Sequence, residues 1–383
     1  MPGRMDSLQA FARHKLAGLE ALSLRRTPVE TSRLDGLWVE RDGRRLLSFS
    51  CNDYLNLSHH PAIKAAAAAA IETYGAGAGA ARLVTGDHPP LEALEAALAE
   101  WKGAEACCVF GSGFVAAVGA IPAVVGGGDL ILLDALSHAC LFSGAKLSGA
   151  RVETFAHNDA ADLERLLGLH RGDAHRALVI TEGVFSMDGD IAPLDAISAA
   201  CERHDAWLMV DDAHALGVIG GGRGSGAVFP TARVHLAMGT LSKALGSFGG
   251  YVCADRPVID LLKTRARSSV FATALPPASA AAALAALRIV QAEPQRVAAV
   301  LANARAFTDA AGLTPAQSAI VPVILGSAQA ALDAQAALEG QGLLAMAIRP
   351  PTVPKGAARL RLAFSAAHDL ADIARLAAAV RAL

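Results

Sequence analysis

Short apolar runs alternate with helix-like segments through the middle of the chain. The runs end at polar or glycine positions, as buried strands do, and they cover residues 106–110, 130–133, 177–181, 207–210 and 236–238. Segments with helical spacing separate most of these runs, for example 159–167 and 193–204. The alternation predicts an α/β fold with a mostly parallel, doubly wound sheet, and in such sheets ligands gather at the carboxyl ends of the strands.

The two ends of the chain have a different texture. On the N-terminal side we expect a helix over 6–24, a hairpin of 37–39 and 46–49 around Asp42-Gly43, and helices over 61–74 and 90–102. After Pro276-Pro277 an alanine-rich helix covers 278–291, and a compact α+β segment follows. These changes predict an N-terminal arm over 1–50, a large domain over 51–277 and a smaller α+β C-terminal domain over 278–383.

Length, charge and composition argue against several classes of protein. The chain has 383 residues, which suggests a large domain with a smaller one, or two domains, rather than a single small domain. Its net charge is −2 and it has no run of Lys or Arg, which argues against nucleic-acid binding. The most membrane-like stretch, 109–133, is broken by glycines and Pro122, so we expect no membrane span. The polar N-terminus over 1–13 lacks the apolar stretch of a secretory signal, which predicts a cytoplasmic protein. The six cysteines form no Cys-x-x-Cys pair and no zinc-like spacing with histidine, so we expect no metal site.

A glycine-containing turn, Phe-Gly-Ser-Gly-Phe over 110–114, follows an apolar strand and opens a helix. Glycines there let the backbone approach an anion closely, and the start of the helix supplies N–H groups. Gly111, Gly113 and Ala116 also fit a dinucleotide fingerprint, with Asp134 at the end of the next strand. By itself the segment is compatible with either kind of phosphate site and with a plain tight turn.

Two further segments carry a carboxylate, an imidazole and an amine at predicted strand ends. A buried strand delivers Asp211 to its carboxyl end, where a carboxylate can hold a pyridine nitrogen protonated, and His214 follows three residues later. Lys243 lies among small residues after the next apolar run, so its amine can lose solvation and become nucleophilic. Thr240 and Ser242 beside it are candidate phosphate ligands.

Two more polar residues follow strand ends. His138 could stack on a flat heteroaromatic ring or move a proton, and Ser186, in the polar loop 181–190, could bond a cofactor. Each residue alone is also compatible with a structural role. In combination, Asp211, the histidine three residues later and Lys243 favour pyridoxal 5′-phosphate (PLP) over a nicotinamide cofactor, because a dehydrogenase needs none of these three groups.

Three motifs give the chain a resemblance to a known family, and they cover 181–190, 210–214 and 239–246. Their sequences, Thr-Glu-Gly-Val-Phe-Ser-Met-Asp-Gly-Asp, Val-Asp-Asp-Ala-His and Gly-Thr-Leu-Ser-Lys-Ala-Leu-Gly, are similar to those of the α-oxoamine synthases, which are fold-type I PLP-dependent enzymes. The resemblance runs from Phe49 to Arg361. The segment 348–354, Ile-Arg-Pro-Pro-Thr-Val-Pro, is most similar to the members that condense L-alanine with a pimeloyl thioester.

The resemblance implies a role for each candidate residue. For the cofactor, Lys243 would be the Schiff-base lysine and the catalytic base, and Asp211 would pair with the pyridine nitrogen. His138 would stack on the ring, and His214 and Ser186 would bond the ring oxygen. The residues around the cofactor would be Gly113, Phe114 and Thr240. For the substrates, Asn52 and Arg361 would receive the carboxylate of L-alanine, and Thr352 and Arg25 would contact the acyl group. The resemblance also implies a homodimer with active sites at the interface, built partly from 75–82, where this chain lacks the serines that the family often has among the glycines.

Three alternatives stay open on the sequence alone. Within the family, the substrates could be glycine with acetyl-CoA or succinyl-CoA. The glycine turn leaves a nicotinamide dehydrogenase open. A PLP-binding protein without catalysis is the third, although binding alone does not need a poised base. The acyl carrier, coenzyme A or a protein, is not decided by the sequence either.

Overall fold

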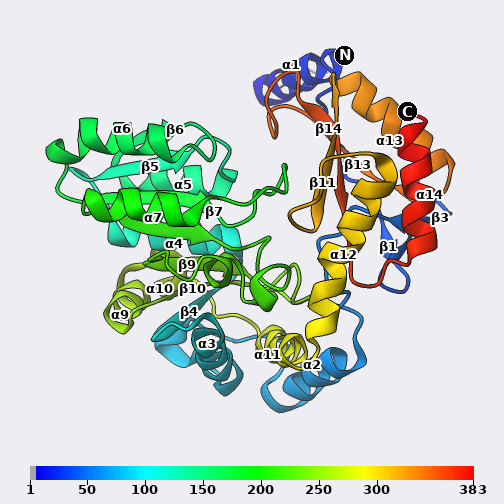
Figure 1. The fold of residues 1–383 in the computed structure, drawn as a ribbon. Helices are drawn as coiled ribbons and strands as arrows, with labels where there is room; N and C mark the ends of the chain where they lie inside the picture. The colour runs from blue at the N-terminus through cyan, green and yellow to red at the C-terminus, as the bar shows by residue number, and fades with distance from the viewer. Residues whose placement is uncertain (1–5) are drawn as a thin grey trace.

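The computed structural model describes residues 6–383, and a seven-stranded sheet organises the larger part of the fold (Figure 1). The strand order is β4-β10-β9-β8-β7-β5-β6, with the bounds β4 Ala106–Phe110, β5 Leu130–Asp134, β6 Arg151–Phe155, β7 Ala177–Glu182, β8 Trp207–Asp211, β9 Leu236–Thr240 and β10 Gly250–Ala254. Neighbouring strands from β9 to β6 run parallel, whereas β10 is antiparallel to both of its neighbours. The predicted mostly parallel, doubly wound sheet is therefore confirmed.

Helices cover both faces of this sheet, which is why its strands are continuous apolar runs. One face carries α4 (Gly113–Val124), α5 (Ala139–Ser148) and α9 (Arg256–Arg265). The other face carries α6 (Ala160–His170) and α7 (Leu194–Arg203) over β5, β7 and β8, and α3 (Pro89–Lys102) over β4 and β10. Alternate residues of one strand face opposite layers, so in β5 Ile131 packs in the first layer and Leu132 in the second.

The predicted strands and the helices between them agree with the structure to within a few residues at their ends. The sequence alone does not identify β6 and β10. β6 is an edge strand in which Arg151 and Glu153 pair with each other at the surface, so it has no continuous apolar run. β10 begins at the last of a group of glycines, and such a segment looks like a loop until its two neighbouring strands are in place.

The N-terminal hairpin pairs with the C-terminal part of the chain. β1 (Ser32–Arg33), β2 (Trp38–Arg41) and β3 (Arg44–Ser48) form a sheet with β12 (Leu343–Leu344), which runs parallel to β3. Asp42 and Gly43 both have positive φ, 50° and 68°, as a two-residue hairpin turn requires, so the predicted turn is confirmed. The domain boundaries expected after residues 50 and 277 stay a prediction.

A second small sheet and three helices complete the C-terminal part. The sheet has the order β11-β14-β13, with the bounds β11 Ile320–Gly326, β13 Met346–Ile348 and β14 Ala358–Ala363. The helices are α12 (Pro294–Ala311), α13 (Ala328–Gly340) and α14 (Leu370–Arg381), and their apolar sides share one core with Phe49, Phe307 and Phe364. The remaining helices are α1 Ser7–Ala21, α2 Pro61–Tyr74, the π-helix η1 Arg82–Gly86, η2 Arg171–Asp173, η3 Gly220–Gly222, α8 Ser225–Val228, α10 Arg267–Val270 and α11 Pro277–Ala292. In Figure 1, α1 lies at the upper end of the C-terminal part, and α2 and α11 pack side by side at the bottom.

The stretch 109–133, which looked most like a membrane span, contributes to β4, α4 and β5 in the protein core. Across residues 6–383, no helix is long and apolar enough to cross a membrane. In the same part of the chain, no three His, Cys, Asp or Glu side chains are grouped in a way that could hold a metal ion.

His157 connects three segments at the carboxyl edge of the sheet. Its Nδ1 lies 2.9 Å from Asp134 Oδ1 at the end of β5, and its Nε2 lies 2.8 Å from Asp190 Oδ2 in the loop after β7. Asn158 donates its backbone N–H to Asp134 and its side-chain amide to Asp190, at 2.8 Å each. Burial disfavours the charged ring, but the two carboxylates outweigh it and raise the pKa of His157 to about 10. The ring is therefore an imidazolium at neutral pH and ties the loop 183–190 to the sheet.

Because folding raises the pKa of His157 from 6.5 to about 10, its ion pairs stabilise the fold fully below the lower value and lose this contribution as the pH rises through the upper one. His157→Gln should therefore lower the free energy of unfolding by about 2 kcal/mol at neutral pH and by much less at about pH 10.5. Urea unfolding of both proteins at the two pH values measures the difference. His204→Gln, which removes a histidine paired with Glu164 at the surface, is the control and should change stability little. Equal losses at both pH values would contradict a stabilising imidazolium.

Candidate active site

Two carboxylates lie side by side at the carboxyl ends of adjacent parallel strands. Glu182 ends β7, Asp211 ends β8, and the two are partners in the register of the ladder. Register partners on neighbouring strands point to the same face of a sheet. Both are buried, with 2% and 4% of their surface exposed. Lys243 follows β9, the next strand, and its positive charge acts on both carboxylates.

Asp211 has one oxygen available for a ligand. Its Oδ1 accepts the backbone N–H of Ala213 at 2.9 Å, while no donor among residues 6–383 is hydrogen-bonded to its Oδ2. Burial raises the pKa of Asp211 to about 6, and the charge of Lys243 opposes this rise. A positively charged ligand group beside Oδ2 would stabilise the ionised form, as expected for a partner of a protonated ring nitrogen.

Lys243 is half-buried near the two acids Asp211 and Glu182. Burial lowers the pKa of its amine, although Asp211 and Glu182 favour the charged form. A lower pKa increases the share of neutral amine, which is the nucleophilic form. The loss of solvation expected from the small residues around Lys243 is therefore present in the structure.

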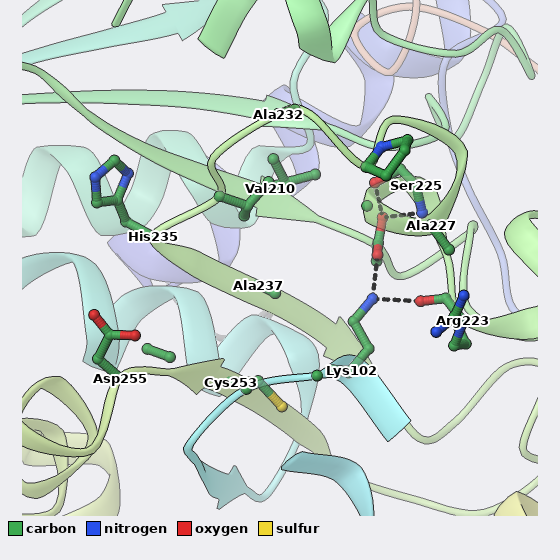
Figure 2. A pocket seen from close by; sticks show the side chains of 17 residues that line it. Lys102, Val210, Arg223, Ser225, Ala227, Ala232, His235, Ala237, Cys253 and Asp255 are labelled. Atoms are coloured by element: carbon green, nitrogen blue, oxygen red, sulfur yellow. Dashed lines mark hydrogen bonds and ion pairs between the residues drawn. The ribbon is translucent and has the colours of Figure 1, made fainter. Parts of the chain in front are cut away.

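The two adjacent aspartates, Asp211 and Asp212, differ in their partners within residues 6–383, and only Asp211 has a carboxylate oxygen available for a ligand. Side chains of successive residues in an extended chain point to opposite sides. Lys102 donates to Asp212 Oδ2 at 2.6 Å, and Ser225 donates to Oδ1 at 2.5 Å. This group lies at the wall of a pocket of about 410 Å³, and Lys102 also donates to the carbonyl of Arg223 at 2.6 Å. Figure 2 shows Lys102, Ser225 and Arg223 at this wall, with the interactions of Lys102 drawn as dashed lines. Asp212 is therefore already paired, whereas Asp211 faces Lys243.

His138 is the N-cap of α5 and borders a cavity. Its backbone N–H donates to Glu182 Oε1 at 2.5 Å, and its Nδ1 lies 2.9 Å from Cys140 Sγ. Burial, helped by the nearby lysine charge, lowers the pKa of His138, so the imidazole is neutral. The cavity has a volume of about 540 Å³, and Ser186 and Thr352 also line it. The structure thus brings three of the predicted site residues around one space.

Arg361, on β14, donates from all three of its guanidinium nitrogens to other parts of the chain. Its Nε donates to the Ser186 carbonyl at 2.5 Å, its Nη1 to Asn52 Oδ1 at 3.1 Å and its Nη2 to Tyr54 Oη at 3.3 Å. Arg361 is only 6% exposed, so these acceptors satisfy a buried charge. The predicted pair of Asn52 and Arg361 is therefore brought into contact, beside the loop that carries Ser186.

Tyr54, which the sequence analysis did not single out, connects this guanidinium to His214. Tyr54 is fully buried, and its Oη lies 2.6 Å from His214 Nδ1. Burial, followed by the charges of Lys243 and Arg361, lowers the pKa of His214 well below its ordinary value, so this ring is neutral. In the sequence, Tyr54 lies between Asp53 and Leu55, and no local pattern there indicates a hydrogen bond to a residue 160 positions away.

The glycine turn before α4 lies against the strand end that carries Thr240. A Cβ added at Gly113 would lie 3.4 Å from the Thr240 Cβ, an ordinary contact distance, so the start of the helix packs directly beside the end of β9. The first N–H groups of α4, at Gly113 and Phe114, suit an anion. The side chain of Phe114 is 49% exposed and belongs to the surface, so only its backbone is placed for such a contact.

This set of groups fits PLP. Asp211 suits the pyridine nitrogen, a poorly solvated Lys243 suits the aldehyde, and the neutral ring of His138 suits the face of the cofactor. The start of α4 with Thr240 suits the phosphate. These residues come from separate strand ends and meet only in the folded chain.

Asp134, which completed the dinucleotide fingerprint, is not free to bind a ribose. It is fully buried, and its carboxylate accepts hydrogen bonds from the backbone N–H groups of Leu136 and Asn158, both at 2.8 Å, and is paired with His157. The nicotinamide alternative therefore lacks the acidic residue that it requires.

The structure places Arg26, rather than Arg25, beside Thr352. Arg25 is paired with Glu20 at the surface at 3.1 Å, whereas Arg26 donates to Thr352 Oγ1 at 2.7 Å. Successive side chains of an extended segment point to opposite sides, so a shift of one residue exchanges the inward and outward positions. The sequence around these two arginines has no repeating pattern that could have decided between them.

Comparisons with known sequences show the family of the chain. The family model described as aminotransferase class I and II matches residues 44–380. The 8-amino-7-oxononanoate synthase of Beijerinckia indica is 60% identical over 380 residues, covering 99% of this chain and 98% of the relative. That of Methylobacterium radiotolerans is 62% identical over 379 residues, covering 99% of both chains.

Solved structures share the fold. A serine palmitoyltransferase from S. paucimobilis with bound PLP–myriocin aldimine has a TM-score of 0.92 and 29% identity, covering 99% of this chain and 98% of that one. The 8-amino-7-oxononanoate synthase from Francisella tularensis has a TM-score of 0.76 and 26% identity, covering 88% of this chain and 97% of that one. The expected fold-type I architecture is therefore confirmed. From its fold, its site and these relatives, the chain belongs to the 8-amino-7-oxononanoate synthase family, within the class I and II aminotransferases.

Proposed function

We propose that this protein catalyses the decarboxylative condensation of L-alanine with a pimeloyl thioester, in biotin biosynthesis. The α-carbon of alanine loses its proton and bonds to the thioester carbonyl carbon, and the C–S bond breaks to release a thiol. The alanine carboxylate then leaves as CO2, and a proton is added to the α-carbon. The product is 8-amino-7-oxononanoate, the compound in the names of the relatives. We place the reaction in the cytoplasm, and recovery of the activity in another cell fraction would contradict that location.

One observation carries the proposal: a pair suited to bind a carboxylate lies beside the reactive lysine. Arg361 Nη1 and Asn52 Oδ1 are 3.1 Å apart, and the charge of Arg361 acts on Lys243. A planar guanidinium binds a carboxylate through two parallel hydrogen bonds, which orients it. An amino acid held there by its carboxylate would direct its α-carbon towards Lys243.

The residues around Lys243 have complementary roles in proton transfer. When bound, PLP supplies a conjugated ring that takes up the electron pair left at the α-carbon. Lys243 Nζ removes the α-proton as general base, and its lowered pKa favours the neutral amine that this step needs. With PLP bound, Asp211 would keep the ring nitrogen protonated, and neutral His138 would lie over the ring. His214 and Ser186 would hydrogen-bond the ring oxygen.

The cavity of about 540 Å³ suits the acyl substrate. Phe142 and Val353 line it with apolar surface, as a methylene chain requires, and Thr352 lines it as well. Arg26 donates to Thr352, and its charge, after burial, lowers the pKa of Arg349. Two neighbouring guanidinium groups attract a carboxylate, so we assign Arg26 and Arg349 to the carboxylate at the far end of the pimeloyl chain.

Lys243→Ala removes the amine that binds PLP and the proposed base. Turnover should fall by at least about 10³-fold, because a general base alone contributes factors of this size, while the thermal unfolding of the protein stays close to that of the wild type. Turnover is measured as thiol released from pimeloyl-CoA in the presence of L-alanine. Thiol release at the wild-type rate by this variant would exclude both roles of Lys243.

Substrate choice in the wild-type protein separates the proposal from its alternatives. Thiol should appear only when L-alanine and the pimeloyl thioester are both present. Faster release with glycine and acetyl-CoA or succinyl-CoA would favour another α-oxoamine synthase. A yellow PLP complex with no thiol release from any pair would favour a binding protein.

Arg26→Ala should raise the KM for the pimeloyl thioester about 10-fold or more and leave the KM for L-alanine nearly unchanged, because it removes a charged hydrogen-bond donor from the acyl site alone. Arg25→Ala is the matched control, since it removes the same charge one residue away at the surface. Steady-state thiol release, with each substrate varied in turn, measures both constants. A larger effect of Arg25→Ala on the KM for the pimeloyl thioester would favour Arg25 as the residue that contacts the acyl substrate.

We also propose a homodimer, because a large apolar surface borders the site. Leu83 and Val84 in η1 are 69% and 73% exposed, Phe271 is 73% exposed and Phe114 is 49% exposed. The helix α10 contacts both η1 and α4, so these side chains belong to neighbouring elements. Exposed apolar surface of this kind marks an interaction site, and a second copy of the chain is the partner implied by the family resemblance.

Val84→Asp should shift the protein from the mass of two chains towards that of one, because a buried, unpaired carboxylate at an interface is strongly destabilising. Light scattering after size-exclusion chromatography measures the mass. Leu169→Asp is the control, since Leu169 is 61% exposed at the end of α6, on a different helix, and its variant should stay dimeric. A wild-type protein with the mass of one chain would contradict the homodimer.

A further inference from the structure

Glu182 is a buried acid in the site to which the proposed mechanism assigns no step. It ends β7, is 2% exposed and lies beside Asp211 on the same face of the sheet. A carboxylate in a protein interior needs hydrogen-bond donors or a cation around it. Its partners therefore indicate what it does.

Both oxygens of Glu182 accept backbone N–H groups, and the two donors come from different loops. Oε1 accepts from His138 at 2.5 Å, in the turn between β5 and α5, and Oε2 accepts from Ser186 at 3.3 Å, in the loop after β7. β5 and β7 are neighbours in the sheet, so one side chain bridges the two segments that follow these strands. These loops carry the residues that we propose to cover the PLP ring and to bond its oxygen.

The hydrogen-bond geometry of this bridge, in which both oxygens accept, favours a carboxylate. Burial raises the pKa of Glu182 well above its ordinary value, and the charge of Asp211 adds to the rise. The two N–H donors and the charge of Lys243 act in the opposite direction and stabilise the ionised form. Both oxygens of a carboxylate accept, whereas the amide nitrogen of a glutamine would set one donor against another.

We propose that Glu182 is a positioning residue whose carboxylate holds the loops of His138 and Ser186 at the spacing that PLP requires. This inference rests on the proposed cofactor site and adds to it a residue that acts through two others. A glutamine can satisfy only one of the two loops, and an aspartate is one methylene shorter and cannot reach both. Either change leaves a buried N–H without its acceptor, so one loop moves.

The test compares full-length Glu182→Gln and Glu182→Asp with Asp129→Asn. Asp129 is a matched control because it is 3% exposed and accepts the backbone N–H of Gly126 at 2.8 Å, but lies just before β5, at the opposite edge of the sheet. Three quantities are measured for each protein: the Kd for PLP from visible absorbance, the amide exchange of the two loops in the PLP-free chain, and the urea midpoint of unfolding.

Both Glu182 variants should raise the Kd for PLP about tenfold and speed amide exchange at His138 and Ser186, since a lost hydrogen bond to a charged group has an effect of this size. Asp129→Asn should keep the Kd and the exchange of these loops within about twofold of wild type, even where its urea midpoint falls. If one Glu182 variant does not fold, the other carries the same test.

Two results would overturn the inference: a Kd for PLP close to that of wild type in a folded Glu182 variant, or loop exchange that matches the Asp129→Asn control. A wild-type protein that binds no PLP would instead overturn the proposed function. In that case amide exchange in the PLP-free chain would still show whether Glu182 holds the two loops.

Discussion

Three hydrogen bonds from one buried guanidinium connect parts of the chain that are far apart in sequence. Arg361 donates to Asn52 and Tyr54, which follow the N-terminal hairpin, and to the Ser186 carbonyl in the loop after β7. A buried cation destabilises the fold unless its N–H groups find acceptors, so these segments have to meet at one place. The site is therefore assembled by the same interactions that join the small C-terminal sheet to the large one. In the proposed reaction, the substrate carboxylate would meet a cation that the fold has already positioned.

The loop after β7 is held from several sides, and this explains how irregular backbone can keep an ordered site. Glu182 binds its start, His157 binds Asp190 near its end, and Arg359 donates to the Met187 carbonyl at 3.1 Å. Glu182 and Arg359 are buried, with 2% and 4% of their surface exposed, and hydrogen bonds made by buried charged groups are strong. The position of Ser186 thus depends on both the large sheet and β14. A change in either should alter the contact that Ser186 is proposed to make with the cofactor.

The three acids Glu182, Asp211 and Asp212 differ in their hydrogen-bond partners, and we expect them to differ in function for this reason. Asp211 and Glu182 are neighbours on one face, yet Glu182 has two backbone donors and Asp211 has one, which leaves an oxygen of Asp211 for a ligand. Asp212, one residue on, is paired with Lys102. Carboxylates close together in sequence therefore have different tasks because they have different partners. Burial of Asp211 and Lys243 without such pairing costs stability, as is common where a fold prepares a reactive site.

The sequence by itself determined the parallel sheet, most of its strands and the candidate residues for PLP binding, because apolar periodicity and short motifs are local properties of the chain. Only the tertiary structure decided that Arg26 rather than Arg25 contacts Thr352, that Tyr54 joins His214 to Arg361, and that Glu182 bridges two loops. These contacts depend on which way each side chain points and on distances between segments that are remote in sequence. No local pattern encodes such distances, since they arise when the strands, the loops and the C-terminal sheet pack together.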